Sequence, residues 1–203
     1  MSQKIYNLFK TAGLTHWGAC AMLGNFEAES SLKANNLQNS FEKGGIGDTT
    51  YTLAVDNGLY KNFVNDQAGY GLAQWTHPDR KRKLLAFVQE AHASIGDETT
   101  QVEFAIHELK TEYASLFNYL CSVGADGLYA ACDRICREYE RPAVNNVAAR
   151  YAFAQKWDKF FTLNGIADLD TETAKPTEPP EPEADKLDVI ITKLDEILAK
   201  LEG

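Results

Sequence analysis

The sequence predicts an α+β, mostly helical fold that carries one small β-hairpin. Apolar residues recur with the helical period over several long segments, for example within 97–113. The pair Asn57-Gly58 separates two short runs of β-prone residues, 51–55 and 59–64. Asn-Gly is a preferred two-residue hairpin turn, so we expect the two runs to pair as antiparallel strands.

The helix boundaries follow from the residues that begin and end each periodic segment. We expect helices over 3–12 and 16–30, because Gly13 interrupts the pattern and Thr15 is a good N-cap for the second helix. Pro78 suits the first turn of the next helix. The remaining expected segments are a polar, glycine-rich loop over 33–50 and helices over 77–92, 97–113, 114–122, 126–139 and 146–161.

Three segments of different composition make up the chain. Its 203 residues, 44% of them hydrophobic, are enough for one domain with a sizeable core plus an appendage. We assign residues 1–165 to that domain. Residues 166–185 hold four of the six prolines and many acidic residues, which predicts a semi-extended linker. Residues 186–203 return to helical spacing and predict a short coiled-coil-like helix.

The net charge of -9 belongs mainly to the C-terminal segments. Residues 1–165 carry 16 Lys/Arg against 18 Asp/Glu, whereas residues 166–203 carry 4 against 11. The domain is therefore nearly neutral and has no long basic stripe, so we expect no nucleic-acid partner. Its one basic run, residues 80–83, is interpreted as the solvated face of a helix, with contact to an anionic polymer or phosphate as the alternative.

The four cysteines lie in apolar, helical contexts and are interpreted as small buried thiols of a protein made in a reducing cytoplasm. Cys132 and Cys136 share a helix face, but no histidine or second cysteine pair stands at zinc-site spacing, so we expect no metal and no cofactor. The N-terminus shows no apolar signal-peptide core, and no apolar run reaches membrane-spanning length. We expect no membrane partner.

Glu29 closes an amphipathic stretch some forty residues before a glycine-flanked segment, residues 69–75 (GYGLAQW). Glycoside cleavage needs a carboxylic acid that stays protonated until it gives its proton to the leaving oxygen. Apolar and aromatic neighbours, among them Trp17 and Phe26, can raise the pKa of such a glutamate by desolvation. Glu27 lies two residues away and points to another face of the helix.

Five short stretches together resemble the phage tail lysozyme family: residues 54–58, 62–66, 69–76, 80–81 and 139–142. The resemblance extends over roughly 5–162 and implies a lysozyme-like fold. Members occur in phage tail-tip proteins and in endolysins of phages that infect Gram-positive hosts. The resemblance implies that the protein cuts the bond between N-acetylmuramic acid and N-acetylglucosamine in peptidoglycan, with Glu29 as the catalytic acid. We expect synthesis in the host cytoplasm without a signal peptide and action on the cell wall after release.

A second catalytic carboxylate has three candidates. Asp48 lies in the glycine-rich loop, and Asp56 on the expected hairpin turn has an ordinary explanation, since such turns favour aspartate. Asp66 ends a strand beside the segment that should line the cleft, so we prefer it. Some lysozyme relatives use the single glutamate alone, which leaves the second position open.

Sugar binding is assigned to Tyr70, Gln74 and Trp75, because aromatic faces stack on pyranose rings and an amide can hold N-acetyl or hydroxyl groups. The alternative is that Tyr70 and Trp75 fill the core. Tyr139 and Glu140 are interpreted either as the opposite wall of the cleft or as the end of a helix.

Three other functions remain open. The same glutamate could serve a lytic transglycosylase, which lets the muramoyl 6-hydroxyl rather than water complete the reaction. The fold could serve a non-catalytic wall-binding or tail structural module. A cysteine peptidase would pair Cys20 with a histidine, but Cys20 lies inside a helix rather than at its N-terminus. The histidines available for that pairing are His16, His77, His92 and His107.

The C-terminal helix has an apolar stripe that a helix of its length cannot cover alone in water. Heptad spacing with leucine at one core position and isoleucine at the other favours more than two strands, whereas a shifted register with Ile191 and Leu198 at the first core position leans to fewer. Because the stripe is broad, we expect a trimer or tetramer. Docking on the domain or contact with a wall component are the alternatives. The stripe consists of Leu187, Ile190, Ile191, Leu194, Ile197, Leu198 and Leu201.

Overall fold

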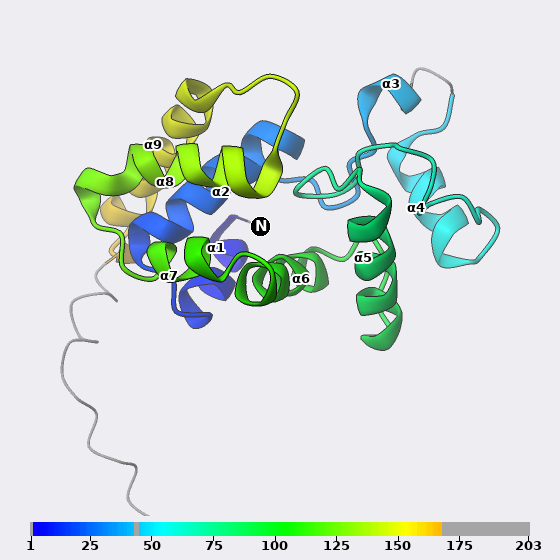
Figure 1. Cartoon of the computed structure of the whole chain (residues 1–203), viewed down its shortest axis with the longest axis horizontal. Helices are drawn as coiled ribbons and strands as arrows, with labels where there is room; N and C mark the ends of the chain where they lie inside the picture. The colour runs from blue at the N-terminus through cyan, green and yellow to red at the C-terminus, as the bar shows by residue number, and fades with distance from the viewer. Residues whose placement is uncertain (1, 43–44, 168–203) are drawn as a thin grey trace, which may run out of the picture. The chain divides into compact units, whose positions relative to one another are not determined.

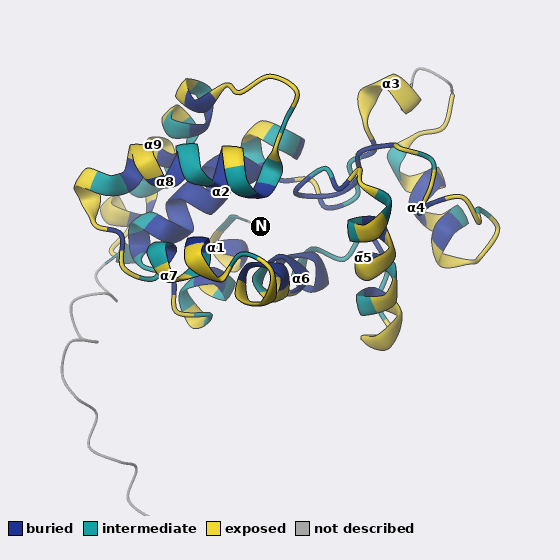
Figure 2. Ribbon diagram, in the orientation of Figure 1, coloured by how far each residue is buried: buried dark blue, intermediate teal, exposed yellow. Residues whose placement is uncertain are grey.

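Helix α2 (His16–Ser30) is the central element of the fold (Figure 1). Its residues are buried on nearly every side, from His16 through Phe26, so it has no polar stripe (Figure 2). It packs most extensively against α9 (Val147–Leu163). Gly24 makes the close approach possible, since a Cβ there would lie 2.5 Å from the carbonyl oxygen of Arg150.

The computed structural model describes residues 2–42 and 45–167, and within them helices predominate. Helices α3, α4 and α5 lie apart from the group around α2, and α6 lies between (Figure 1). No helix in these two ranges is long and apolar enough to cross a membrane. The other elements are α1 (Ser2–Thr11), α3 (Asn39–Glu42), α4 (Asp48–Asp56), α5 (Pro78–Glu90), α6 (Glu98–Thr111), α7 (Ala114–Leu120), the 3₁₀ turn η1 (Ala125–Gly127), α8 (Leu128–Arg134) and the π-helical segment η2 (Ile135–Glu140).

The predicted helices are confirmed, and so are two of the residues expected to begin them. Thr15 caps α2 as expected, since its hydroxyl accepts a hydrogen bond from the amide of Gly18 at 3.1 Å. Pro78 begins α5. The segment expected as one helix over 126–139 is η1, α8 and η2 in sequence.

The predicted β-hairpin over 51–64 is wrong, because its first half is helix α4. Tyr51 and Val55 are buried one helical turn apart, and the side-chain amide of Asn57 donates to the carbonyl of Leu53 at 2.8 Å. Gly58 follows with φ +68°, the left-handed conformation in which helices commonly end. Asn-Gly therefore terminates a helix here rather than joining two strands.

The extended pairing within the described residues is confined to isolated bridges, which join Tyr70 to Leu37 and to Trp75. Tyr70 and Trp75 exchange both backbone hydrogen bonds, at 3.2 and 2.9 Å, and so close residues 70–75 into a tight loop. Gly71 and Gln74 inside this loop both have positive φ. The mostly helical class is thus confirmed, with a closed loop in place of the hairpin.

The interpretation of residues 80–83 as one solvated face is wrong for half of the run. Lys81 is fully buried, and the side chain of Arg80 is 16% exposed, whereas Arg82 and Lys83 are exposed. From residue 168 onward the chain lies outside the described residues. This part includes most of the predicted linker over 166–185 and all of the predicted oligomerisation helix over 186–203.

Candidate active site

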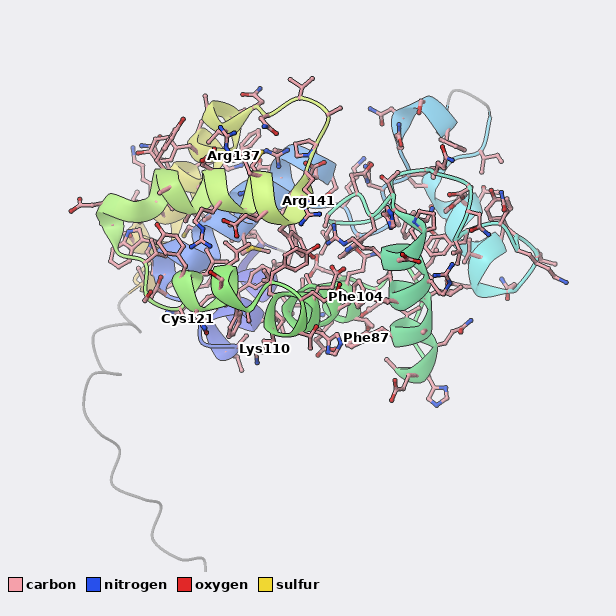
Figure 3. All side chains as sticks on the ribbon, viewed as in Figure 1. Phe87, Phe104, Lys110, Cys121, Arg137 and Arg141 are labelled. Atoms are coloured by element: carbon pink, nitrogen blue, oxygen red, sulfur yellow. The ribbon has the colours of Figure 1, made fainter. Side chains whose placement is uncertain are left out.

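A cleft of about 890 Å³ opens beside the C-terminal end of α2. Glu29 lines it from α2, Gln74 from the closed loop, Arg80 from α5, and Tyr139 and Glu140 from η2. Arg141, which follows η2 and is labelled in Figure 3, also lines the cleft. Segments far apart in the sequence therefore meet around Glu29.

Glu29 is held by a buried arginine. Arg150 of α9 donates from Nη2 to Oε1 of Glu29 at 2.5 Å, and the two side chains are 5% and 16% exposed. Nη1 of Arg150 donates to the side-chain oxygen of Asn25 at 3.2 Å. Glu27 bonds Lys156 and Trp157 instead and does not line the cleft. Of the two neighbouring glutamates, Glu29 is the one that faces the cleft.

Ser30 ties the end of α2 to the closed loop. Its hydroxyl is within 3.0 Å of the carbonyl oxygens of Phe26 and Leu72 and can donate to either. The amide of Leu72 donates to Oε1 of Gln101 at 2.8 Å, and Gln101 is fully buried. The loop is therefore anchored on both sides, which fixes its position relative to Glu29.

A buried network around Glu108 of α6 supports the cleft. Arg80 donates from Nε and Nη2 to the two carboxylate oxygens of Glu108, at 2.7 Å each. Trp75 Nε1 and the Tyr139 hydroxyl donate to Glu108 Oε2 at 2.9 and 2.8 Å. A bidentate arginine pair with two further donors satisfies the carboxylate fully. No pattern in the sequence predicted this network.

The aromatic residues expected to stack on sugars are buried. Trp75 and Tyr70 are 0% exposed and do not line the cleft, and the Tyr70 hydroxyl lies 2.6 Å from that of Thr52. Their geometry favours the alternative that they fill the core. Tyr139 lines the cleft but is also buried. Gln74 lines it, and its amide nitrogen donates to Asn36 and Gly71 carbonyls.

Asp66 does not line the cleft, so the structure does not favour it as the second carboxylate. Its side chain is 2% exposed and accepts from Lys81, itself 0% exposed, at 2.5 Å. The hydroxyls of Tyr51 and Tyr60 and the amide of Ala68 donate to it as well. This satisfied, buried ion pair holds α5 against the preceding loop.

Asp48 and Asp56 are also engaged in structure. Asp48 accepts the amide of Leu37 at 2.8 Å, and Asp56 accepts the amide of Ile95 at 2.9 Å and the hydroxyl of Ser94 at 2.6 Å. Neither lines the cleft. All three aspartates considered from the sequence therefore join segments of backbone rather than face a substrate.

Glu140 is the carboxyl that the structure adds to the site. It lines the cleft, yet both its carboxylate oxygens are excluded from solvent and find no hydrogen-bond partner among the described residues. Burial raises the pKa of Glu140 well above its usual value, and the charge of Glu29 raises it further. Glu140 belongs to one of the stretches that resemble the family, residues 139–142, but the sequence left open whether it forms a wall of the cleft or only ends a helix.

The cysteine-peptidase alternative has the right neighbours but the wrong environment. Cys20 Sγ lies 3.8 Å from His16 Nε2, which also lies 2.8 Å from Asp158. Cys20 is fully buried, and burial raises the pKa of its thiol far above the usual value. No cluster of three metal-ligating side chains occurs in residues 2–42 and 45–167.

The family of the chain follows from comparison with known proteins. The phage tail lysozyme family matches residues 1–161, and the chain belongs to this family. A search among curated proteins found no match. Membership supports a lysozyme-like hydrolase with peptidoglycan as its substrate, in agreement with a cleft that Glu29 enters from the end of a helix.

Proposed function

We propose that the protein cleaves the glycan of bacterial peptidoglycan between N-acetylmuramic acid and N-acetylglucosamine, with Glu29 as the proton donor. The observation that carries the proposal is the position of Glu29. It stands at the end of α2, faces the cleft, and is fixed by Ser30 against the closed loop of residues 70–75.

In the proposed reaction Glu29 gives its proton to the glycosidic oxygen as the bond to the anomeric carbon breaks. The carboxylate then takes a proton from the attacking hydroxyl. When water attacks, the products are those of a muramidase. When the muramoyl 6-hydroxyl attacks, an anhydro sugar forms, as in a lytic transglycosylase.

The transglycosylase route has one specific observation in its favour. A hydrolase that inverts configuration needs a second carboxylate to activate water. Asp48, Asp56 and Asp66 are all committed to backbone or lysine partners away from the cleft. Of the other carboxyls that line it, Asp79 and Glu112 are paired with cations, and burial raises the pKa of Glu140, which favours its protonated form over that of a base. The transglycosylase route, in which Glu29 alone supplies acid and base, is therefore the second candidate. Mass analysis of the released fragments separates the two, because one route yields anhydro-muropeptides.

Glu27 provides a matched control for Glu29. Both glutamates lie on α2, both side chains are 16% exposed, and each is paired with a cation of α9. We expect Glu29→Gln to lower the rate of turbidity loss of purified Gram-positive walls by about 10²–10⁴-fold, the usual contribution of a general acid. Glu27→Gln should retain the parental rate. Equal rates for the two variants would contradict the assignment, and thermal unfolding of both variants checks that the fold persists.

We further propose an endolysin role, with synthesis in the host cytoplasm and access to the wall after release, and self-association through residues 186–203 as a trimer or tetramer. Several tethered domains raise the avidity for a polymeric wall. Light scattering on the full chain should give a multiple of the 22.6 kDa chain mass, whereas a chain ending at Gly165 should be monomeric. Monomeric masses for both would contradict self-association.

A further inference from the structure

Four carboxyl groups line the cleft within the described residues, and one of them, that of Glu140, lacks the cationic partner that the others have. Asp79 and Glu112 bond Arg82 and Lys83 and are open to solvent. Glu29 is paired with Arg150, as described above. Glu140 has two buried oxygens without a partner in the described part of the chain. An ionised carboxylate in this condition is strongly destabilised, so the group must hold a proton or gain a partner.

A buried donor without a partner accompanies these acceptors. Nε of Arg150 makes no hydrogen bond to the described residues, although its Nη atoms bond Glu29 and Asn25. The positive charge of Arg150 acts on Glu140 and lowers its pKa, against the larger effect of burial. The Nη atoms of Arg150 are thus engaged with Glu29 and Asn25, and its Nε–H is left for a second carboxyl.

We propose that Glu29 and Glu140 hold one proton between them and that Arg150 determines which of the two carries it. In the arrangement that the structure shows, Arg150 pairs with Glu29, and the proton rests on Glu140. When Arg150 turns Nε toward Glu140, that carboxyl ionises and Glu29 takes the proton. Glu29 then donates it to the leaving oxygen, and the inference rests on that proposed role. Glu140 acts through Glu29 and is a positioning residue.

The charges around Glu140 come from four helices and explain why one proton is shared. Glu29 of α2 and Glu108 of α6 raise the pKa of Glu140, while Arg80 of α5 and Arg150 of α9 lower it. Of the two cations that lower the pKa of Glu140, Arg80 is already paired with Glu108, so Arg150 is the one that can compensate either Glu29 or Glu140. One arginine stabilises one carboxylate, and the neighbouring carboxyl stays neutral.

Glu140 lies at the end of a π-helical segment. Glu140 is the last residue of η2, and the amide of Arg141 donates to the carbonyl of Cys136 at 2.8 Å, which closes a wide π turn. Arg141 then takes the left-handed conformation, with φ +52°. Segments of π-helix inside longer helices occur frequently at functional sites.

Infrared spectroscopy of the full chain tests the proton directly, without reference to activity. We expect the carbonyl stretching band of a protonated carboxylic acid at neutral pH, absent in Glu140→Gln and unchanged in Glu27→Gln. In Glu29→Gln, Arg150 becomes free to bond Glu140, so the same band should disappear at a lower pH than in the parent protein. Absence of the band in the parent, or its persistence in Glu140→Gln, overturns the inference.

Kinetics on purified walls test the consequence for catalysis. In Glu140→Gln the shape of the side chain is kept, so the affinity for a chitooligosaccharide should stay within about twofold of the parent, while kcat at neutral pH falls about tenfold or more. Activity should recover as the pH is lowered, because Glu29 then takes its proton from solvent. Glu140→Asp should restore part of the activity at neutral pH. A parental pH–rate profile for Glu140→Gln would overturn the inference.

The two tests separate this inference from the proposed function. If the infrared band behaves as expected but the parent protein cleaves no wall, the proposed function fails and the shared proton stands. If the parent cleaves walls and Glu29→Gln does not, while Glu140→Gln shows the parental pH–rate profile, the proposed function stands and the role of Glu140 fails. If Glu140→Gln unfolds, the infrared titration of Glu29→Gln decides instead: a carboxylic-acid band that disappears at the same pH as in the parent protein would count against the inference.

Discussion

Replacing Glu108 by glutamine removes the centre of the buried network beneath the cleft. Glu108 is 0% exposed and accepts four hydrogen bonds, three of them on Oε2. The best placement of the amide keeps its oxygen at the Oε2 position, and its NH₂ group then faces Nε of Arg80, a donor facing a donor. The guanidinium, 16% exposed, also loses its counter-charge.

We expect Glu108→Gln to lower the free energy of unfolding by about 3–5 kcal/mol, the usual effect of breaking a buried ion pair. That is a large fraction of the roughly 5–15 kcal/mol by which domains are stable. Urea unfolding followed by circular dichroism measures the change. The midpoint of thermal unfolding should fall on the order of 10 °C.

Glu112→Gln is the matched control, because Glu112 directly follows α6 and is also paired with a cation of α5. The pair is exposed, with 36% of Glu112 and 52% of Lys83 accessible, so its loss should change the free energy of unfolding by only about 0–1 kcal/mol. If Glu108→Gln and Glu112→Gln proved equally mild, the network would be dispensable and the reasoning from burial would be refuted.

Two further predictions follow from the geometry of buried groups. Asp66→Asn should lower the free energy of unfolding by several kcal/mol, because it leaves Lys81 as an uncompensated buried charge. The fraction that stays folded should cleave walls at the parental rate. A variant that is stable but cleaves slowly would instead support Asp66 as a catalytic residue. Cys20 should resist alkylation in the native protein and react only after unfolding, because the thiol is buried and burial raises its pKa. Peptide mass mapping of the alkylated protein measures the labelling of Cys20. Rapid labelling in the native state would contradict the prediction.

Local signals in the sequence were sufficient to predict most of the helices. Thr15 and Pro78 mark helix starts through interactions within one turn, so their meaning does not depend on the rest of the fold. Asn57-Gly58 misled because the left-handed conformation that suits a hairpin turn also ends a helix. The four-residue spacing of the buried Tyr51 and Val55 fits one turn of a helix. The β-prone residues of this segment nevertheless favoured a strand over a helix.

The candidate site was less predictable, because its contacts join distant segments. Glu29 was found from the sequence, but its partner Arg150 is 121 residues away and stands in no local pattern. Arg80 and Lys81 belonged to a basic run that looked solvated, and only the positions of Glu108 and Asp66 show why Arg80 is half-buried and Lys81 fully buried. Side-chain burial at such places depends on tertiary packing, which residue type alone does not reveal.

The packing of α2 against α9 bears on how the protein is made. The central helix leaves the ribosome well before its main partner, α9, which begins only at Val147. Until that segment has been synthesised, the apolar surface of α2 has no permanent cover, and long-range contacts of this kind slow folding. Until α9 has been made, a nascent chain therefore lacks both the cover of α2 and Arg150, the partner of Glu29, and is prone to aggregation. A chain that stops before α9 would share both defects.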